Sequence, residues 1–92
     1  MYRLLPTKSY KRSIKKLKHS GSFDDGALSK VITVLASGRV LEARYRDHQF
    51  TGELKLYREC HVKGDLLLVY QIRRNELLLI LVDIGTHSYL NF

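Results

Sequence analysis

The chain has 92 residues, enough for one domain (residues 1–92) and too few for two. Hydrophobic residues make up 45% and charged residues 27%, which indicates a globular domain and excludes a disordered chain. Sixteen Lys and Arg against nine Asp and Glu give a net charge of +7, which favours a polyanionic partner: nucleic acid, ribosome, membrane surface or acidic protein. The single cysteine, Cys60, excludes an internal disulfide framework and a cysteine-based zinc site.

The compartment is predicted from three further features. No apolar run approaches the ~20 residues that a membrane span needs. Residues 1–6 contain no signal-peptide core. A lone cysteine is typical of a reducing compartment. We therefore expect a cytoplasmic protein without a membrane partner.

The first half of the chain has helical periodicity. Residues 2–5 predict a short strand that ends at Pro6, the only proline. In residues 8–19 apolar side chains recur at helical spacing and Lys or Arg occupy most other positions, which predicts an amphipathic helix with a basic exposed face. A second helix is expected to open at Ser22 and to stop at Gly38. The two form a helical hairpin.

The second half of the chain is rich in strand signals. Residues 54–62 alternate between apolar and polar side chains, although Arg58 interrupts the apolar side. Residues 66–72 and 77–84 are nearly continuous apolar runs, which predict two strands buried on both faces and paired as an antiparallel hairpin. Residues 39–52 predict an ordered loop. The expected architecture is α+β, with the helical hairpin packed on a small, mostly antiparallel sheet.

Histidines fall where this topology can bring them together. If the three expected strands form a meander, His61 and Asp65 flank one turn and His87 ends the third strand at the same edge. Imidazole has an ordinary pKa near ~6.5 and serves as base or acid at neutral pH, while Lys and Arg can hold a phosphate. This set suits phosphodiester chemistry. Ordinary surface histidines remain an alternative, and so does a zinc site with His48 included, although no closely spaced ligand pair supports zinc.

Three motifs, in order, resemble those of the YafQ-type toxins of the RelE/ParE superfamily. Residues 45–52, YRDHQFTG, resemble the family's Y-K-D-H-x-L-x-G loop. Residues 57–70, YRECHVKGDLLLVY, resemble Y-R-E-C-H-x-x-x-D-x-L-L-x-Y, and residues 85–90, GTHSYL, resemble the closing G-[ST]-H-x-x-L-F. The similarity spans nearly the whole chain, with matching spacing between the motifs.

The resemblance implies a microbial RNase-like RelE fold and the toxin of a type II toxin–antitoxin system. It implies an endoribonuclease that uses no metal or cofactor, cleaves mRNA in the ribosomal A site and is neutralised by a cognate antitoxin protein. The family's catalytic positions correspond to His48 or His61 as general base, Asp65 as an orienting or activating carboxylate, and His87 as general acid. Its substrate contacts correspond to Arg46, Lys55, Arg58 and the terminal Phe92.

Asp83 departs from the family pattern, because relatives usually carry Arg four residues before the last histidine. If Asp83 faces the catalytic edge, its charge repels the scissile phosphate. This departure favours an alternative function on the same fold, a non-catalytic toxin that inhibits gyrase or binds ribosome or RNA without cleavage. The three histidines favour the endoribonuclease, because binding alone needs Lys and Arg rather than imidazoles.

Overall fold

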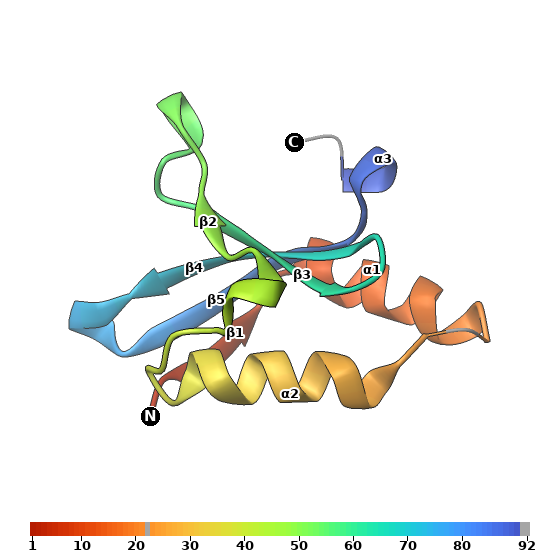
Figure 1. The fold of residues 1–92 in the computed structure, drawn as a ribbon, viewed down its shortest axis with the longest axis horizontal. Helices are drawn as coiled ribbons and strands as arrows, with labels where there is room; N and C mark the ends of the chain where they lie inside the picture. The colour runs from red at the N-terminus through yellow and green to blue at the C-terminus, as the bar shows by residue number, and fades with distance from the viewer. Residues whose placement is uncertain (22, 91–92) are drawn as a thin grey trace.

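The computed structural model describes residues 1–21 and 23–90, and there five strands form one mixed sheet in the order β1-β5-β4-β3-β2 (Figure 1). The strands are β1 (Arg3–Pro6), β2 (His48–Gln49), β3 (Arg58–Lys63), β4 (Leu66–Arg73) and β5 (Leu78–Thr86). Neighbouring strands are antiparallel except β1, which is parallel to β5. The helices are α1 (Lys8–His19), α2 (Asp25–Ala36) and α3 (His87–Leu90). The predicted α+β class is confirmed.

Side-chain caps set where the two long helices begin. The Thr7 hydroxyl accepts a hydrogen bond from the Tyr10 amide at 3.1 Å, so α1 starts at Lys8. The Asp24 carboxylate caps α2 by accepting from the Ala27 amide at 3.0 Å. Ser22, the expected start of this helix, lies outside the described residues. Each of these helices has 12 residues, and no helix within residues 1–21 and 23–90 has the length and apolar character to cross a bilayer.

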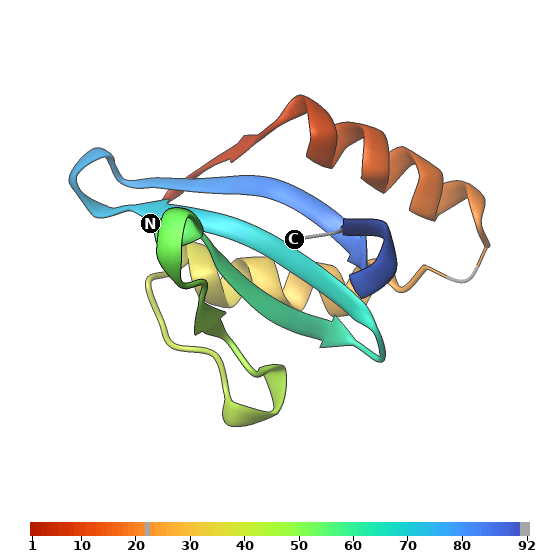
Figure 2. The same cartoon turned by 90° about the horizontal axis from the view of Figure 1, so that it is seen from above.

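The hydrophobic core lies between the sheet and α2. Figure 2 shows α2 beneath the sheet, while α1 runs along β5. We call the side of the sheet that faces α2 the lower face; its core side chains are Cys60, Val62, Leu68, Tyr70 and Leu79. The opposite side is the upper face, which carries Glu59, His61, Leu67, Val69 and Gly85, because side chains alternate along a strand. The β2 segment and α3 both project above this upper face (Figure 1).

Several element boundaries differ from those expected. The strand expected over residues 54–62 begins only at Arg58, because two turns precede it. Gly52–Leu54 forms a 3₁₀ turn (η2), which the Lys55 amide closes on the Gly52 carbonyl at 3.2 Å, and in the next turn the Tyr57 amide donates to the Leu54 carbonyl at 2.9 Å. The expected loop over residues 39–52 contains another 3₁₀ turn (η1, Ala43–Tyr45) and the two-residue strand β2. Residues after Ile84 continue β5 and then form α3. Such short elements have too few residues for periodicity to register.

Candidate active site

The strand register brings three of the predicted residues to one end of the sheet. His61 lies on the upper face of β3, opposite Leu67, which in turn pairs with Gly85 of β5. Leu66 pairs with Thr86, so Asp65 and His87 sit just outside the same pair of residues. Neighbouring strands lie ~4.8 Å apart, which puts the β3 and β5 backbones about 10 Å from each other. The backbones of His61, Asp65 and His87 therefore lie at one end of the β3–β4–β5 sheet.

His48 lies on the upper face as well, because it pairs with Glu59, two residues before His61. Its Nδ1 is 2.8 Å from the Arg46 carbonyl oxygen and its Nε2 is 3.5 Å from Glu59 Oε1. A carbonyl oxygen only accepts, so Nδ1 donates, and in the neutral ring Nε2 is the basic nitrogen. The Arg46 carbonyl thus orients the neutral His48 ring through Nδ1, and Nε2 faces the Glu59 carboxylate.

Glu59 is a residue of this site that sequence reasoning missed. It is 7% exposed, although it is an acidic residue on the polar side of its strand. The Y-R-E-C-H motif contains Glu59 and could have drawn attention to it. Motif spacing, however, does not show that the preceding loop folds back and places His48 opposite Glu59.

A cavity of about 550 Å³ adjoins His61 and Asp65. Cationic side chains border it: Arg44, Arg46 and Lys63. Arg44 stacks on the Tyr45 ring at 4.6 Å, and Lys63 forms an ion pair with Asp24 at 2.7 Å. Arg46 is exposed, and its backbone is left-handed, with φ of 48°. The guanidinium in this solvent-open hollow can attract the phosphodiester anion, while the imidazole and the carboxylate are groups that can exchange or orient protons.

The start of α3 places His87, and a set of contacts holds α3 against β5. The Tyr89 ring lies directly over Gly85, where a Cβ atom would lie 3.2 Å from two ring atoms and closer still to a third. The Tyr89 hydroxyl is 3.0 Å from Ser13 Oγ, and Lys16 lies 5.5 Å from the centre of the ring. His87 itself is exposed at the entrance to α3.

Asp83 takes part in this docking. Ser13 Oγ donates to Asp83 Oδ1 at 2.6 Å, and the Ile84 amide donates to the same oxygen at 2.8 Å. Ser13 is only 3% exposed, so Asp83 satisfies a buried hydroxyl. The Asp83 carboxylate is therefore bonded to α1.

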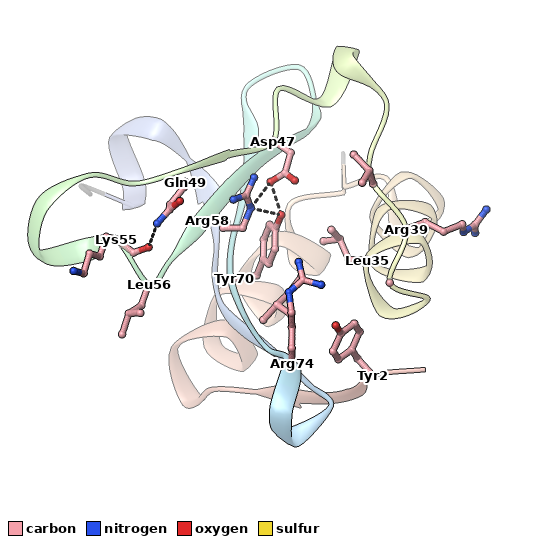
Figure 3. A pocket seen from close by; sticks show the side chains of 13 residues that line it. Tyr2, Leu35, Arg39, Asp47, Gln49, Lys55, Leu56, Arg58, Tyr70 and Arg74 are labelled. Carbon is pink, nitrogen blue, oxygen red and sulfur yellow. Dashed lines mark hydrogen bonds and ion pairs between the residues drawn. The ribbon is translucent and has the colours of Figure 1, made fainter.

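Two other predicted substrate residues, Lys55 and Arg58, line a different cavity from His61 and Asp65. Arg58 is on the lower face, because it is two residues from Cys60, and Figure 3 shows it bonded to Asp47 and Tyr70. Lys55 lies with Arg58 along a second cavity, of about 470 Å³. Phe92 lies outside the described residues. The substrate contacts expected of Lys55, Arg58 and Phe92 stay predictions.

The described residues contain no candidate metal site. Among residues 1–21 and 23–90, no group of three or more His, Cys, Asp or Glu side chains is arranged to hold a metal ion. The four residues weighed for zinc, His48, His61, Asp65 and His87, are not such a group.

Comparison with known proteins decides the family. The family described as the bacterial toxin of type II toxin–antitoxin system, YafQ, matches residues 2–91. The chain belongs to the YafQ toxin family. The mRNA interferase toxin YafQ of Escherichia coli is 34% identical over 76 residues, which cover 82% of this chain and 80% of that protein. A putative toxin YafQ of Haemophilus influenzae is 48% identical over 46 residues, 47% of this chain and 45% of that protein.

Solved structures of YafQ toxins and related toxins have the same fold. A crystal structure of a metal-bound toxin from Helicobacter pylori is 43% identical, covers 98% of this chain and 99% of its own, and superposes with a TM-score of 0.89. The E. coli DinJ–YafQ toxin–antitoxin complex is 29% identical, covers 97% of this chain and 96% of that chain, with a TM-score of 0.85. In our chain the three YafQ-like motifs form the η1–β2 segment, the β3–β4 hairpin and the β5–α3 junction, which meet at the upper face.

Proposed function

We propose that this YafQ-family toxin is a metal-independent, ribosome-dependent mRNA endoribonuclease of the cytoplasm, neutralised by a cognate antitoxin. The observation that supports the proposal is that the backbones of His61, Asp65 and His87 lie at one end of the sheet. Arg46 borders the same cavity as His61 and Asp65, and its carbonyl orients His48. Two findings on the relative from E. coli support the proposal: YafQ is named an mRNA interferase toxin, and it was crystallised with DinJ as a toxin–antitoxin complex.

The chemistry follows from the side chains. His48 or His61 removes the proton of a ribose 2′-hydroxyl, and Asp65 orients that hydroxyl or an imidazole. The 2′-oxygen forms a bond to the adjacent phosphorus while the bond to the 5′-oxygen breaks, and His87 gives a proton to that leaving oxygen. Arg46 neutralises the charge that builds on the non-bridging oxygens. The products are a 2′,3′-cyclic phosphate and a 5′-hydroxyl end.

The basic face of α1 supplies the electrostatic attraction to the ribosome. Six cationic side chains are exposed along this helix: Lys8, Lys11, Arg12, Lys15, Lys16 and Lys18. Neutralising phosphates with such a face releases condensed counterions, which drives association without sequence specificity. The same charge favours an antitoxin whose toxin-binding segment is acidic.

The test is cleavage of an mRNA on purified ribosomes, with the cut ends mapped by primer extension. We expect His61→Ala and His87→Ala to lower the cleavage rate by about 10²–10⁴-fold, with ribosome binding retained. The matched control is His19→Ala, an exposed histidine at the last position of α1 that lies in none of the three motifs. Full cleavage by either variant contradicts the catalytic assignment. Stalled translation with intact mRNA, or inhibited gyrase, supports the non-catalytic alternative instead.

A further inference from the structure

The segment that carries His48 is thinly attached to the rest of the protein. Its strand, β2, pairs with β3 at only two positions, and both of its residues are exposed. Arg46, just before it, has a left-handed backbone that L side chains adopt only when the surroundings impose it. Two paired residues do not by themselves hold an imidazole at a fixed position, so another contact has to hold this segment.

That contact is made by Asp47, on the other side of the sheet. The Tyr70 hydroxyl donates a hydrogen bond to Asp47 Oδ1, and Arg58 Nε donates to the same oxygen at 3.3 Å and lies 3.4 Å from the Tyr70 oxygen (Figure 3). Tyr70 is fully buried, and the side chain of Asp47 is 16% exposed. We call these three residues the Asp47 network.

The network is built to be rigid. Arg58 and Tyr70 are directly paired between β3 and β4, so both groups that hold Asp47 start from the centre of the sheet. Burial raises the pKa of the Tyr70 hydroxyl well above its ordinary value, and the bond to Asp47 adds to this effect. The hydroxyl therefore stays protonated, and remains a donor, throughout the working pH range.

Asp47 and His48 are consecutive, yet their side chains go to opposite sides of the sheet. Asp47 is held on the lower face by Tyr70, while His48 lies on the upper face opposite Glu59. The hydrogen bond that holds the Asp47 side chain on the lower face therefore also fixes the backbone from which the His48 side chain extends on the upper face. It also fixes the Arg46 carbonyl, which accepts the hydrogen bond from His48 Nδ1.

We propose that Tyr70 and Arg58 are positioning residues of the ribonuclease, which fix His48 through Asp47. The inference rests on the proposed function and adds to it: residues on the face opposite the histidines set the geometry of proton transfer. A misplacement of about 1 Å can cost about 10²-fold in rate, so loss of the network lowers the rate constant of cleavage without weakening ribosome binding.

Three substitutions separate positioning from folding. Tyr70→Phe keeps the buried ring and removes only the donor hydroxyl. Asp47→Ala removes the acceptor, while Asp47→Asn keeps an acceptor oxygen and loses the charge. The matched control is Tyr2→Phe, whose hydroxyl has no hydrogen-bond partner among the described residues, in the same cavity.

Single-turnover cleavage on ribosomes is measured at a temperature well below each variant's Tm. We expect Tyr70→Phe and Asp47→Ala to cleave at least tenfold more slowly at saturating toxin, Asp47→Asn to recover most of the rate, and Tyr2→Phe to match the wild type. Arg58→Gln should likewise lower the saturated rate; a loss confined to binding would instead make Arg58 an RNA contact. Unchanged saturated rates in Tyr70→Phe overturn the proposal.

Amide hydrogen exchange tests the same inference without any cleavage. The Phe50 amide donates to the Tyr57 carbonyl at 3.0 Å and closes the end of the His48 segment. In Tyr70→Phe we expect its exchange to rise at least tenfold while amides of β4 and β5 exchange as in the wild type. Equal exchange in the variant refutes positioning, whatever the activity. If the wild type cleaves no mRNA while the Phe50 amide still exchanges faster in Tyr70→Phe, the proposed function is wrong. The conclusion that Asp47 holds the His48 segment then remains.

Discussion

Gly85 is the position where one added methyl group has the largest consequence. In Gly85→Ala the new Cβ lies 3.2 Å from Tyr89 Cγ and Cε2 and inside 3.0 Å of a third ring atom, a separation that real Cβ atoms essentially never show. The ring has to move by about 1 Å to regain ordinary contact at 3.5–4.0 Å. Tyr89 is two residues after His87 in a single turn of helix, so His87 moves with it.

The magnitude follows from the contacts that Tyr89 loses. Its hydroxyl sits 3.0 Å from Ser13 Oγ and its ring 5.5 Å from Lys16 Nζ, and neither contact survives a displacement of that size. One hydrogen bond and one exposed cation–π contact together amount to about 1–2 kcal/mol. In a domain of this size that lowers Tm by about 5–15 °C. The shift of His87 costs about 10²-fold in cleavage rate.

The assays are thermal unfolding and ribosome-dependent cleavage, with Gly26→Ala as the matched control. Gly26 lies in the first turn of α2, where a Cβ meets only Asp24 Oδ1 at 3.5 Å, so this substitution should leave Tm unchanged or raise it. If the clash is the cause, Gly85→Ala has little further effect in a Tyr89→Ala background. Wild-type Tm and cleavage in Gly85→Ala, or an undiminished effect without the Tyr89 ring, refutes the reasoning.

Three further predictions concern α1 and its contacts. Asp83→Ala removes the carboxylate oxygen that accepts from the buried Ser13 hydroxyl and from the Ile84 amide, and should lower the free energy of unfolding by about 1–3 kcal/mol in urea titrations; stability equal to the wild type would show that these bonds contribute nothing. Burial, with a smaller effect of Asp25, raises the pKa of Tyr10 from 10.0 to about 12. Because the folded state favours the neutral phenol, the free energy of unfolding keeps the contribution of Tyr10 in full below pH 10. That contribution falls by about 2–3 kcal/mol between pH 10 and 12, and Tyr10→Phe should lose correspondingly less stability over that range. Ribosome affinity should fall steeply with salt, by about 0.7–0.9 in log–log slope for each phosphate contact; replacing Lys11 and Lys15 with Gln should flatten that slope, and an unaltered slope would assign the contacts elsewhere.

The sequence by itself determined the fold class, the long elements and the family. The α1 boundaries follow from helical spacing and a Thr cap, and both are local properties. The apolar runs that became β4 and β5 are buried on both faces, as residues such as Val69 and Leu79 show. The three motifs pointed to the YafQ toxins, and the match over residues 2–91 confirmed it.

Arg58 shows where sequence reasoning reached its limit. The family resemblance implies a phosphate contact for Arg58, and that role stays a prediction. In the structure this residue lies on the lower face and holds Asp47, 11 residues earlier in the chain. Alternation had already placed Arg58 on the side of Cys60, but its partner is set by the path of a loop that has no periodicity.

Tertiary structure alone decided how the site is assembled. The pairing of His48 with Glu59, the docking of Tyr89 on Gly85 and the bond from Ser13 to Asp83 join residues that are 11, 4 and 70 positions apart. Motif spacing identifies residue types but contains no register between strands, and a shift of one residue would send His61 to the lower face. The register and the loop path, which place the histidines together, arise from packing α2 and the sheet around one core, and that is a property of the whole chain.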